Sequence, residues 1–324
     1  MPVLLSLFIT IVLIIVLIMK ARMNAAVAMF LGALFMGIST GLGAVETVST
    51  LTKGFGNTMA ALGYSVGFGV MMGQMIAATG CVQSIANTLI KVFSKDKADY
   101  ALGTTGFIVS IPVFYDVGYV VLMPLAKTLS KMSDKSIAFF AGALTLGLGL
   151  THTFVPPTPG PMTGAELLGI DIGMMILWGL IIGIPTFLIA MNINRNLLAV
   201  PGYFDPEKHM EVDEEYQKQQ KAMEEEFIKD EKTLPPFGLA VLPILTPIIL
   251  ILLGTVAKAI SGDQPIPAVI AFLSDKSIAM LAGLLVSVGI ALPRMKLKEV
   301  EGEINKALTS VGTVLFITGT GAAL

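Results

Sequence analysis

The apolar segment Ala101–Leu125 is broken at its centre by the residues Ile111-Pro112-Val113-Phe114-Tyr115-Asp116-Val117-Gly118. Proline removes a backbone N–H donor, and a carboxylate is costly to place in hydrocarbon without a partner. Backbone that leaves the helical path at membrane depth is tolerated only where it is buried in protein or lines a water-filled cavity. The segment is therefore not an ordinary spanning helix, and its centre is a candidate place for contact with a solute.

The composition of the 324-residue chain identifies an integral membrane protein. Hydrophobic residues make up 54% of the chain, charged residues make up 14%, and the mean hydropathy is +0.81. These values do not suit a soluble domain. The first apolar run, Val3–Met19, has no basic residue before it and is followed by Lys20 and Arg22, which reverses the order in a cleaved signal peptide. We therefore expect a retained spanning helix.

The residues that usually bind metals are scarce. Cys81 is the only cysteine, which excludes an intrachain disulfide and a cysteine-based metal site. The only histidines are His152 and His209. We expect no metal ion, no other cofactor and no nucleic-acid partner.

Several apolar runs are long enough to be candidate membrane spans. They are Val3–Met19, Asn24–Val45, Phe55–Thr79, Ala101–Leu125, Ser136–Leu150, Gly173–Met191, Phe237–Ala257, Lys276–Leu292 and Ala307–Leu324. A strongly acidic insert, Pro201–Lys232, interrupts the series and carries opposite charges at helical i,i+4 spacing. We interpret it as a solvated surface helix that links two membrane halves, with binding of a regulatory partner as the alternative.

Basic residues predict how the spans are oriented, because they concentrate in cytoplasmic loops. The clusters expected to face the cytoplasm are Lys20/Arg22, Lys91/Lys95/Lys97, Lys127/Lys131/Lys135, Arg195 and Arg294/Lys296/Lys298. The lysines on both flanks of Ala101–Leu125 lie inside if that segment enters from the cytoplasm, turns near Pro112–Asp116 and returns. We therefore predict a re-entrant hairpin over residues 101–125.

A second break follows in the next apolar stretch. After Ser136–Leu150 the chain reads Thr151-His152-Thr153-Phe154-Val155-Pro156-Pro157-Thr158-Pro159-Gly160-Pro161. The prolines from Pro156 to Pro161 should prevent a helix there. We therefore predict a broken helix over residues 136–171.

The sequence also repeats itself at an offset of about 250 residues, and the charge rule gives the two copies opposite orientations. The matches are Ala28-Met29, Gly32 and Leu34 with Ala279-Met280, Gly283 and Leu285, and Asn57, Phe68 and Gly73 with Asn305, Phe316 and Gly321. Inverted repeats are typical of secondary transporters, although Gly/Ala-rich spans also resemble one another by composition alone.

The repeat predicts how the chain is organised. A first membrane repeat should cover residues 1–199, an acidic cytoplasmic linker helix residues 200–236, and a partial second repeat residues 237–324. The predicted fold class is an all-α polytopic membrane protein with inverted repeats, a re-entrant hairpin and broken helices. Because the second repeat is shorter, we expect roughly 115–120 further residues at the C-terminus of the intact protein.

The motifs Ile111–Gly118 and His152–Pro161 together resemble the gluconate permease family (gluconate:H+ symporters, GntP), and the resemblance covers all 324 residues. It implies a multi-pass protein of the bacterial inner membrane that imports gluconate or a related sugar acid with protons. It also implies membership of the ion transporter superfamily and an elevator mechanism, and it allows a homodimer. Many members have His where this chain has Thr158, so the substrate could instead be another sugar acid or D-serine.

Both breaks supply residues suited to a small anion with several hydroxyl groups, which needs amide donors, helix N-termini and hydroxyl partners. The candidate substrate-binding residues are Pro112, Tyr115, Asp116, His152, Thr153, Thr158 and Gly160. Asp116 is the candidate for proton coupling, with a capping role at the hairpin tip as the alternative. His152 could relay a proton or bind the carboxylate, or it could satisfy backbone groups freed by the broken helix.

Two other classes of protein stay open. An ion or solute channel would use similar broken helices but would not couple a substrate to proton movement. A membrane-embedded enzyme is disfavoured, because Asp116 has no second acid deep in the predicted spans. We therefore expect a transporter and not an enzyme.

Overall fold

The computed structural model describes residues 1–93, 95–133, 135–198, 233–262 and 264–323, so most of the predicted acidic linker lies outside the described residues. The described chain is helical and contains no strand, which confirms the all-α class. The helices are α1 (Val3–Met19), α2 (Ala25–Ser39), α3 (Ala44–Ala78), α4 (Cys81–Val92), α5 (Ala98–Val109), α6 (Tyr115–Lys131), α7 (Ile137–Phe154), α8 (Pro159–Leu168), α9 (Ile172–Leu198), α12 (Phe237–Ser261), α13 (Ala268–Leu273), α14 (Lys276–Ala291) and α15 (Leu297–Ala322), with a 3₁₀ turn at Lys95–Lys97.

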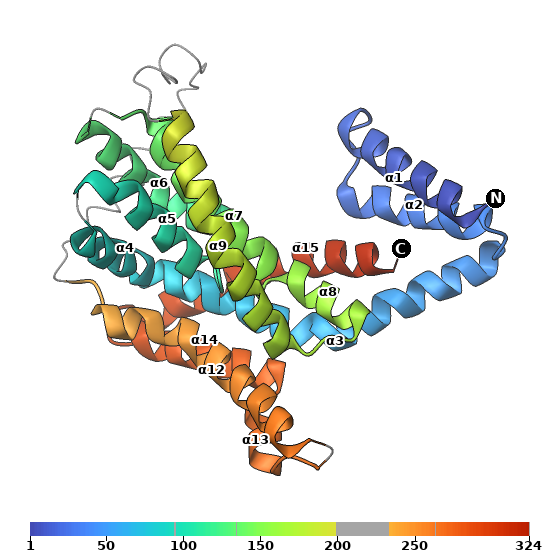
Figure 1. Cartoon of the computed structure of the whole chain (residues 1–324). Coiled ribbons are helices and arrows are strands. Elements are labelled where there is room, and N and C mark those ends of the chain that lie inside the picture. Colours follow the sequence, from blue (N-terminus) through green and yellow to red (C-terminus); the bar gives the residue numbers. More distant parts are fainter. Residues whose placement is uncertain (94, 134, 199–232, 263, 324) are drawn as a thin grey trace.

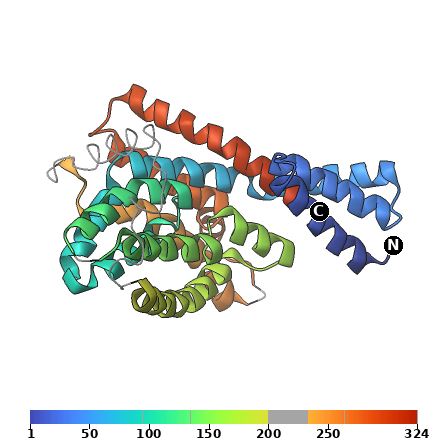
Figure 2. The same cartoon turned by 90° about the horizontal axis from the view of Figure 1, so that it is seen from above.

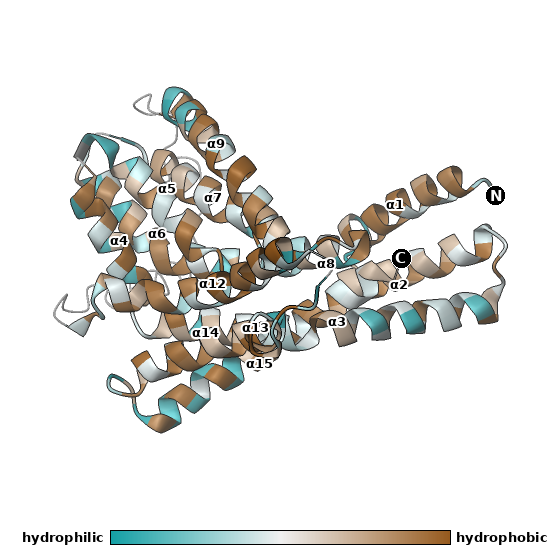
Figure 3. Ribbon diagram, turned by 60° about the horizontal axis from the view of Figure 1, so that its bottom comes forward, coloured by the Kyte–Doolittle hydropathy of each residue, from teal (hydrophilic) through white to brown (hydrophobic). Residues whose placement is uncertain are grey.

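The helices have the lengths and surfaces of a membrane protein. Four stretches are long and apolar enough to cross a membrane: α3, the α7–α8 pair, α9 and α12. Helices α1, α2 and α14 are shorter and apolar. Large apolar side chains point outward, such as Leu4 on α1 and Ile189 on α9, and Figure 3 shows apolar residues along these helices. Such faces suit contact with lipid.

The long helix α3 is the element around which the others are arranged. Helices α14 and α15 lie along α3, and α1 and α2 lie at the end where α3 begins. Helices α4 to α7 gather with α9 at the other end of the molecule, as Figures 1 and 2 both show. The N- and C-terminal ends therefore lie on the same side, away from α4 and α5, while α8 lies beside α15.

Helices α5 and α6 form the predicted hairpin, with a connection over residues 110–114. The tip of the hairpin rests on α3, because a methyl group built at Gly73 would lie 2.6 Å from the carbonyl oxygen of Pro112. The turn ends at Phe114, two residues earlier than expected, so Tyr115 and Asp116 already belong to the first turn of α6.

The predicted broken helix consists of α7 and α8, separated by residues 155–158 with a cis peptide bond between Pro156 and Pro157. The expectation that no helix forms through Pro161 was wrong at its C-terminal end, since α8 begins at Pro159. The first N–H groups of a helix have no intrahelical acceptor, so proline is tolerated in the first turn. The break is therefore shorter than the proline pattern suggests.

Other boundaries differ because polar residues continue the helices beyond the apolar runs. Helix α3 begins at Ala44 and α15 at Leu297, each about ten residues before the predicted span. The helix α4 was not predicted at all, because its apolar face is too short to span a membrane. At α14 the sequence was informative, since Asp275 caps the helix by accepting hydrogen bonds from the backbone of Ser277 and Ile278 at 2.9 and 3.2 Å.

Two glycines at matching positions of the sequence repeat make similar contacts. A methyl group at Gly32 of α2 would collide with Ile14 of α1, at 2.6 Å. A methyl group at Gly283 of α14 would collide first with the sulfur of Met72 in α3, and it would lie 3.0 Å from the carbonyl oxygen of Pro243 in α12. Gly32 therefore allows α2 to approach α1 closely, and Gly283 allows α14 to approach both α3 and α12.

Candidate functional site

The tip of the α5–α6 hairpin and the break between α7 and α8 meet against one face of α3. Together they enclose a narrow cavity of about 10 Å³, which is at most the size of one water molecule. Its walls are Val66, Gly69 and Val70 of α3, Pro112 and Phe114 of the tip, and Pro157, Thr158 and Pro159 of the break. The two sequence motifs, separated by some forty residues, are thus brought into contact.

Thr158 is buried in this contact and holds the break together. Its hydroxyl lies 2.8 Å from the carbonyl oxygen of His152 and 3.0 Å from that of Val155. These carbonyl groups belong to the end of α7, where the helical hydrogen bonds stop. In this arrangement the Thr158 hydroxyl serves as a donor to the backbone.

His152 lies in the last turn of α7 with its ring 5.6 Å from that of Phe114 at the hairpin tip. Its Nδ1 atom is buried and has no hydrogen-bond partner among the described residues, and the same is true of the Oγ1 atom of the fully buried Thr151. Buried polar atoms normally have partners. Both atoms are closed to water in this conformation, so a ligand or a water molecule would reach them only if the contact opened.

Tyr115 and Asp116 are neighbours in sequence but face different surroundings. The Tyr115 hydroxyl lies 3.4 Å from Oγ1 of Thr145 on α7, so this side chain braces the hairpin against α7. Asp116 is exposed and lines a cavity of about 790 Å³, and it is close enough to His152 for an electrostatic interaction. The first turn of α6 has no side-chain cap, so Asp116 does not cap it.

Thr153 and Gly160 were also predicted to bind substrate, but they lie away from both cavities. Both residues are exposed, and the Thr153 hydroxyl donates to the carbonyl oxygen of Gly149 at 2.7 Å. A methyl group at Gly160 would meet no atom within 4 Å. The structure therefore brings Pro112, His152 and Thr158 together and leaves these two residues outside the contact.

The larger cavity contains polar residues that the sequence did not identify. Gln74 of α3 donates to Oε2 of Glu303 in α15 at 2.7 Å, and Lys306 donates to Oε1 of the same carboxylate at 2.6 Å. Arg294, which follows α14, lines the cavity as well. These residues come from helices far apart in the sequence, so no local motif could have revealed them. Within the described residues, no group of three or more His, Cys, Asp or Glu could hold a metal ion.

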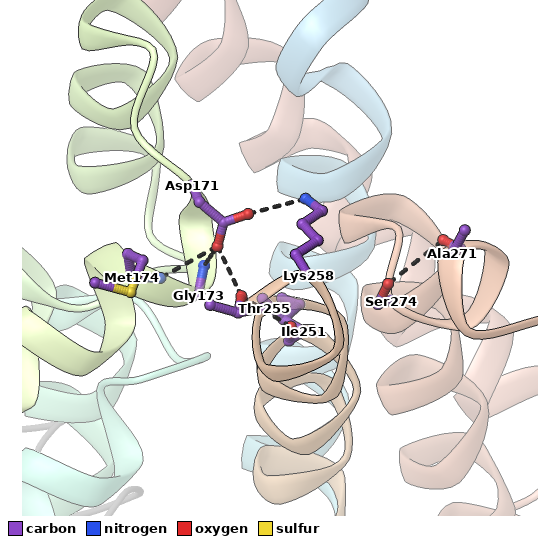
Figure 4. Close-up of polar contacts among 8 residues, drawn as sticks. All are labelled: Asp171, Gly173, Met174, Ile251, Thr255, Lys258, Ala271 and Ser274. Atoms are coloured by element: carbon purple, nitrogen blue, oxygen red, sulfur yellow. Dashed lines mark hydrogen bonds and ion pairs between the residues drawn. The ribbon is translucent and has the colours of Figure 1, made fainter. Parts of the chain in front are cut away.

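A second polar cluster joins the segments on either side of the acidic insert (Figure 4). Asp171, between α8 and α9, accepts hydrogen bonds from Thr255 at 2.7 Å and Lys258 at 3.0 Å, both on α12, and from the backbone N–H of Gly173 at 2.9 Å. Burial raises the pKa of Asp171, but the bonds from Thr255 and Lys258 outweigh it and hold the pKa below its usual value.

A further ion pair lies beside this cluster, with Lys276 of α14 at 2.9 Å from Glu166 of α8. From the sequence alone, Glu166 and Asp171 are expected only to lie near the outer surface. The structure gives both of them partners on the far side of the insert, about a hundred residues away in the sequence.

A helical hairpin and a broken helix that meet among apolar helices, next to a polar cavity, are the features of a multi-pass membrane transport protein. The comparison with known families agrees with this class. The chain belongs to the GntP permease family, since the family described as "GntP family permease" matches residues 1–324. The predicted family is thus confirmed, as are the assignment to transport proteins rather than enzymes and the inner-membrane, multi-pass location.

Similar proteins are found in several bacteria. An uncharacterized permease of Haemophilus influenzae is 34% identical, with 98% of this chain and 66% of the relative aligned. A gluconate permease of Bacillus licheniformis is 31% identical (97% and 70%), and a high-affinity gluconate transporter of Escherichia coli is 30% identical (97% and 69%). The chain spans about two thirds of the length of these relatives.

Proposed function

We propose that the protein is a proton-coupled secondary transporter that imports gluconate or a related sugar acid across the bacterial inner membrane. The observation that carries the proposal is the contact of the hairpin tip with the broken helix on α3, next to the cavity that Asp116 lines. Support for the substrate class comes from the family and from two relatives that are named for gluconate.

The proposed substrate-binding residues lie at and around this contact. They are Pro112, Tyr115, Asp116, His152, Thr153, Thr158 and Gly160. The unpartnered Nδ1 atom of His152 suits a hydroxyl or carboxylate group. Thr158 would bind a substrate by giving up its bonds to the backbone, and Thr153 and Gly160 would join the site only when the break opens.

Asp116 is the proposed proton carrier. Asp116 is exposed to the cavity and does not cap α6. It also lies close enough to His152 for an electrostatic interaction. An acid within a membrane protein that is in contact with a water-filled space can exchange protons with the bulk solution. Asp116 lies in the first turn of α6 without a capping hydrogen bond, which favours a role in proton coupling over a role as a cap.

The proposal includes the predicted organisation of the chain into a first repeat over residues 1–199, a linker over residues 200–236 and a second, inverted repeat over residues 237–324. The contacts of Gly32 with α1 and of Gly283 with α12 support equivalent roles for α2 and α14. Inverted repeats place substrate sites where their broken elements face one another.

Uptake into proteoliposomes tests the substrate and the coupling together. Labelled gluconate should accumulate when the outside is acidic, and a protonophore should abolish the accumulation. Other sugar acids should compete with gluconate. Stronger competition by D-serine would indicate an amino-acid substrate. Uptake that does not depend on the pH gradient would indicate a channel or another coupling ion.

The Asp116→Asn variant tests the proposed proton carrier. Proton-driven uptake should be lost while the melting temperature in detergent stays the same, because Asp116 is exposed and makes no cap. Glu301→Gln is the matched control, since Glu301 is an exposed acid that does not line the cavity. Normal coupled uptake by Asp116→Asn would remove Asp116 from the mechanism.

A further inference from the structure

We propose that the 790 Å³ cavity is a second station for the substrate, in which Arg294 binds the carboxylate and Gln74, held by Glu303, binds a hydroxyl group. The inference rests on the proposed function, because it requires an anionic substrate that carries hydroxyl groups. It adds residues from α3, α15 and the turn after α14 to a site that the sequence placed only in the two breaks.

The cavity has the size and the location that such a station needs. Pockets of several hundred Å³ hold small ligands. The cavity is bounded by α3, α4, α6, α15 and the turn after α14, and Asp116 lies in its wall. Arg294 belongs to a basic cluster with Lys296 and Lys298, which the positive-inside rule assigns to the cytoplasmic side. A substrate leaving toward the cytoplasm would therefore pass through the space in which Asp116 is exposed.

The orientation of the Gln74 amide follows from its partner. A carboxylate only accepts hydrogen bonds, so the group that faces Oε2 of Glu303 at 2.7 Å is the Gln74 nitrogen. Lys306 occupies the other carboxylate oxygen at 2.6 Å and fixes Glu303 in turn. The amide oxygen of Gln74 is thereby turned away from Glu303, and it is an acceptor for a hydroxyl group in the cavity.

Arg294 supplies the positive charge that an acid needs. Its Nη1 atom donates to the carbonyl oxygen of Ile290 at 2.9 Å, which anchors the guanidinium at the end of α14. No carboxylate of the described residues lies within 4.0 Å of this guanidinium, so its charge is not neutralised by an ion pair there. The planar guanidinium group matches the geometry of a carboxylate.

Gln83 contributes a further polar side chain to the wall of the cavity. This residue lines the cavity from α4, and its Oε1 atom is buried without a hydrogen-bond partner among the described residues. A buried acceptor of this kind is costly unless a donor reaches it. The atom is closed to the cavity in this conformation, so a hydroxyl group of the substrate would satisfy it only after the amide turned toward the cavity.

Binding to the detergent-solubilised protein tests the inference, because both faces of the protein are then accessible. The ligands are gluconate and gluconamide, which share their hydroxyl groups and differ in charge. The wild type should prefer gluconate, and Arg294→Gln should lose about 10- to 100-fold in affinity for gluconate with little change for gluconamide. Gln74→Leu should lower the affinity for both ligands by the same factor, since it removes the partner of a hydroxyl group that both ligands carry.

Control variants separate a charge effect from a folding effect. Lys298→Gln removes a nearby positive charge that does not line the cavity, and it should leave the affinity for both ligands unchanged. Arg294→Lys keeps the charge but not the planar pair of donors, so it should keep a weaker preference for gluconate over gluconamide, and this variant provides a test even if Arg294→Gln does not fold.

The outcomes distinguish this inference from the proposed function. If the wild type binds gluconate and Arg294→Gln retains the wild-type preference for gluconate over gluconamide, the station at Arg294 is wrong and the transport proposal stands. A lost preference in a well-folded Arg294→Lys variant would also overturn it. If the wild type binds neither gluconate nor another sugar acid, both proposals fail.

Discussion

Replacing Gly73 with alanine should impair transport while changing stability little, because the side chain would push directly on the hairpin tip. The added methyl group would lie 2.6 Å from the carbonyl oxygen of Pro112 and 3.2 Å from the Cα atom of Val113, where ordinary contact begins at 3.4 Å. The tip must therefore move by about 0.8 Å relative to α3. Both contacts are with backbone, which cannot rotate away as a flexible side chain can.

The expected effect on stability combines two opposing contributions. Overpacking costs about 1–3 kcal/mol, and replacing glycine by alanine within a helix contributes about 1 kcal/mol of stabilisation. The net destabilisation should be about 0–2 kcal/mol. The displacement separates the hairpin tip from the break between α7 and α8, and misplacement of a site by about 1 Å can cost up to 100-fold in rate. We expect a loss of 10-fold or more in the initial rate of gluconate uptake.

The assay pairs the rate of labelled gluconate uptake in proteoliposomes with the melting temperature in detergent. Gly63→Ala is the matched control, since it lies on the same helix and its added methyl group would meet no atom within 4 Å. That control should keep the wild-type rate and gain about 0.5–1 kcal/mol in stability. If Gly73→Ala transports as fast as Gly63→Ala and is equally stable, the hairpin tip does not need its position on α3.

Three further predictions concern stability, each measured as melting temperature in detergent. Asp171→Asn should lower stability by about 1 kcal/mol near neutral pH. Because the pKa of Asp171 is depressed in the folded protein, the difference in stability from the wild type should persist down to about pH 4 and shrink below it. A difference that grows as the pH falls would contradict the assignment. Arg195→Gln should lower stability by about 3 kcal/mol, since it leaves the fully buried Asp99 carboxylate without the guanidinium that lies 3.5 Å away. Adding Asp99→Asn should restore part of this stability, and an equal loss in the double variant would refute the pairing. Thr151→Val should stabilise by about 1 kcal/mol by removing a buried hydroxyl without a partner, whereas a large destabilisation would mean that the hydroxyl is bonded.

The sequence predicted those parts of the fold that depend on local chemistry. The continuous apolar run predicted α1 with the bounds that the structure has. Pro112, followed four residues later by Asp116, predicted the position of the hairpin. The proline-rich stretch located the break between α7 and α8, but not its length, because Pro159 can begin a helix as readily as end one.

The parts that could not be predicted depend on pairs of residues far apart in the chain. Gln74 and Glu303 are 229 residues apart, and neither has a neighbour in sequence that signals a shared cavity. The start of α15 is charged and was left out of the predicted span, although Glu303 is held by partners within the fold. Long-range contacts of this kind become visible only when the helices are placed around α3.

The internal pH of proteoliposomes is the measurement that tests the central claim most directly. When gluconate or another sugar acid is added outside, the interior of wild-type liposomes should become more acidic, and liposomes with Asp116→Asn should show no such change. The claim is contradicted if wild-type protein, with verified insertion and no proton leak, takes up the sugar acid without acidification, or if the Asp116→Asn variant acidifies as the wild type does.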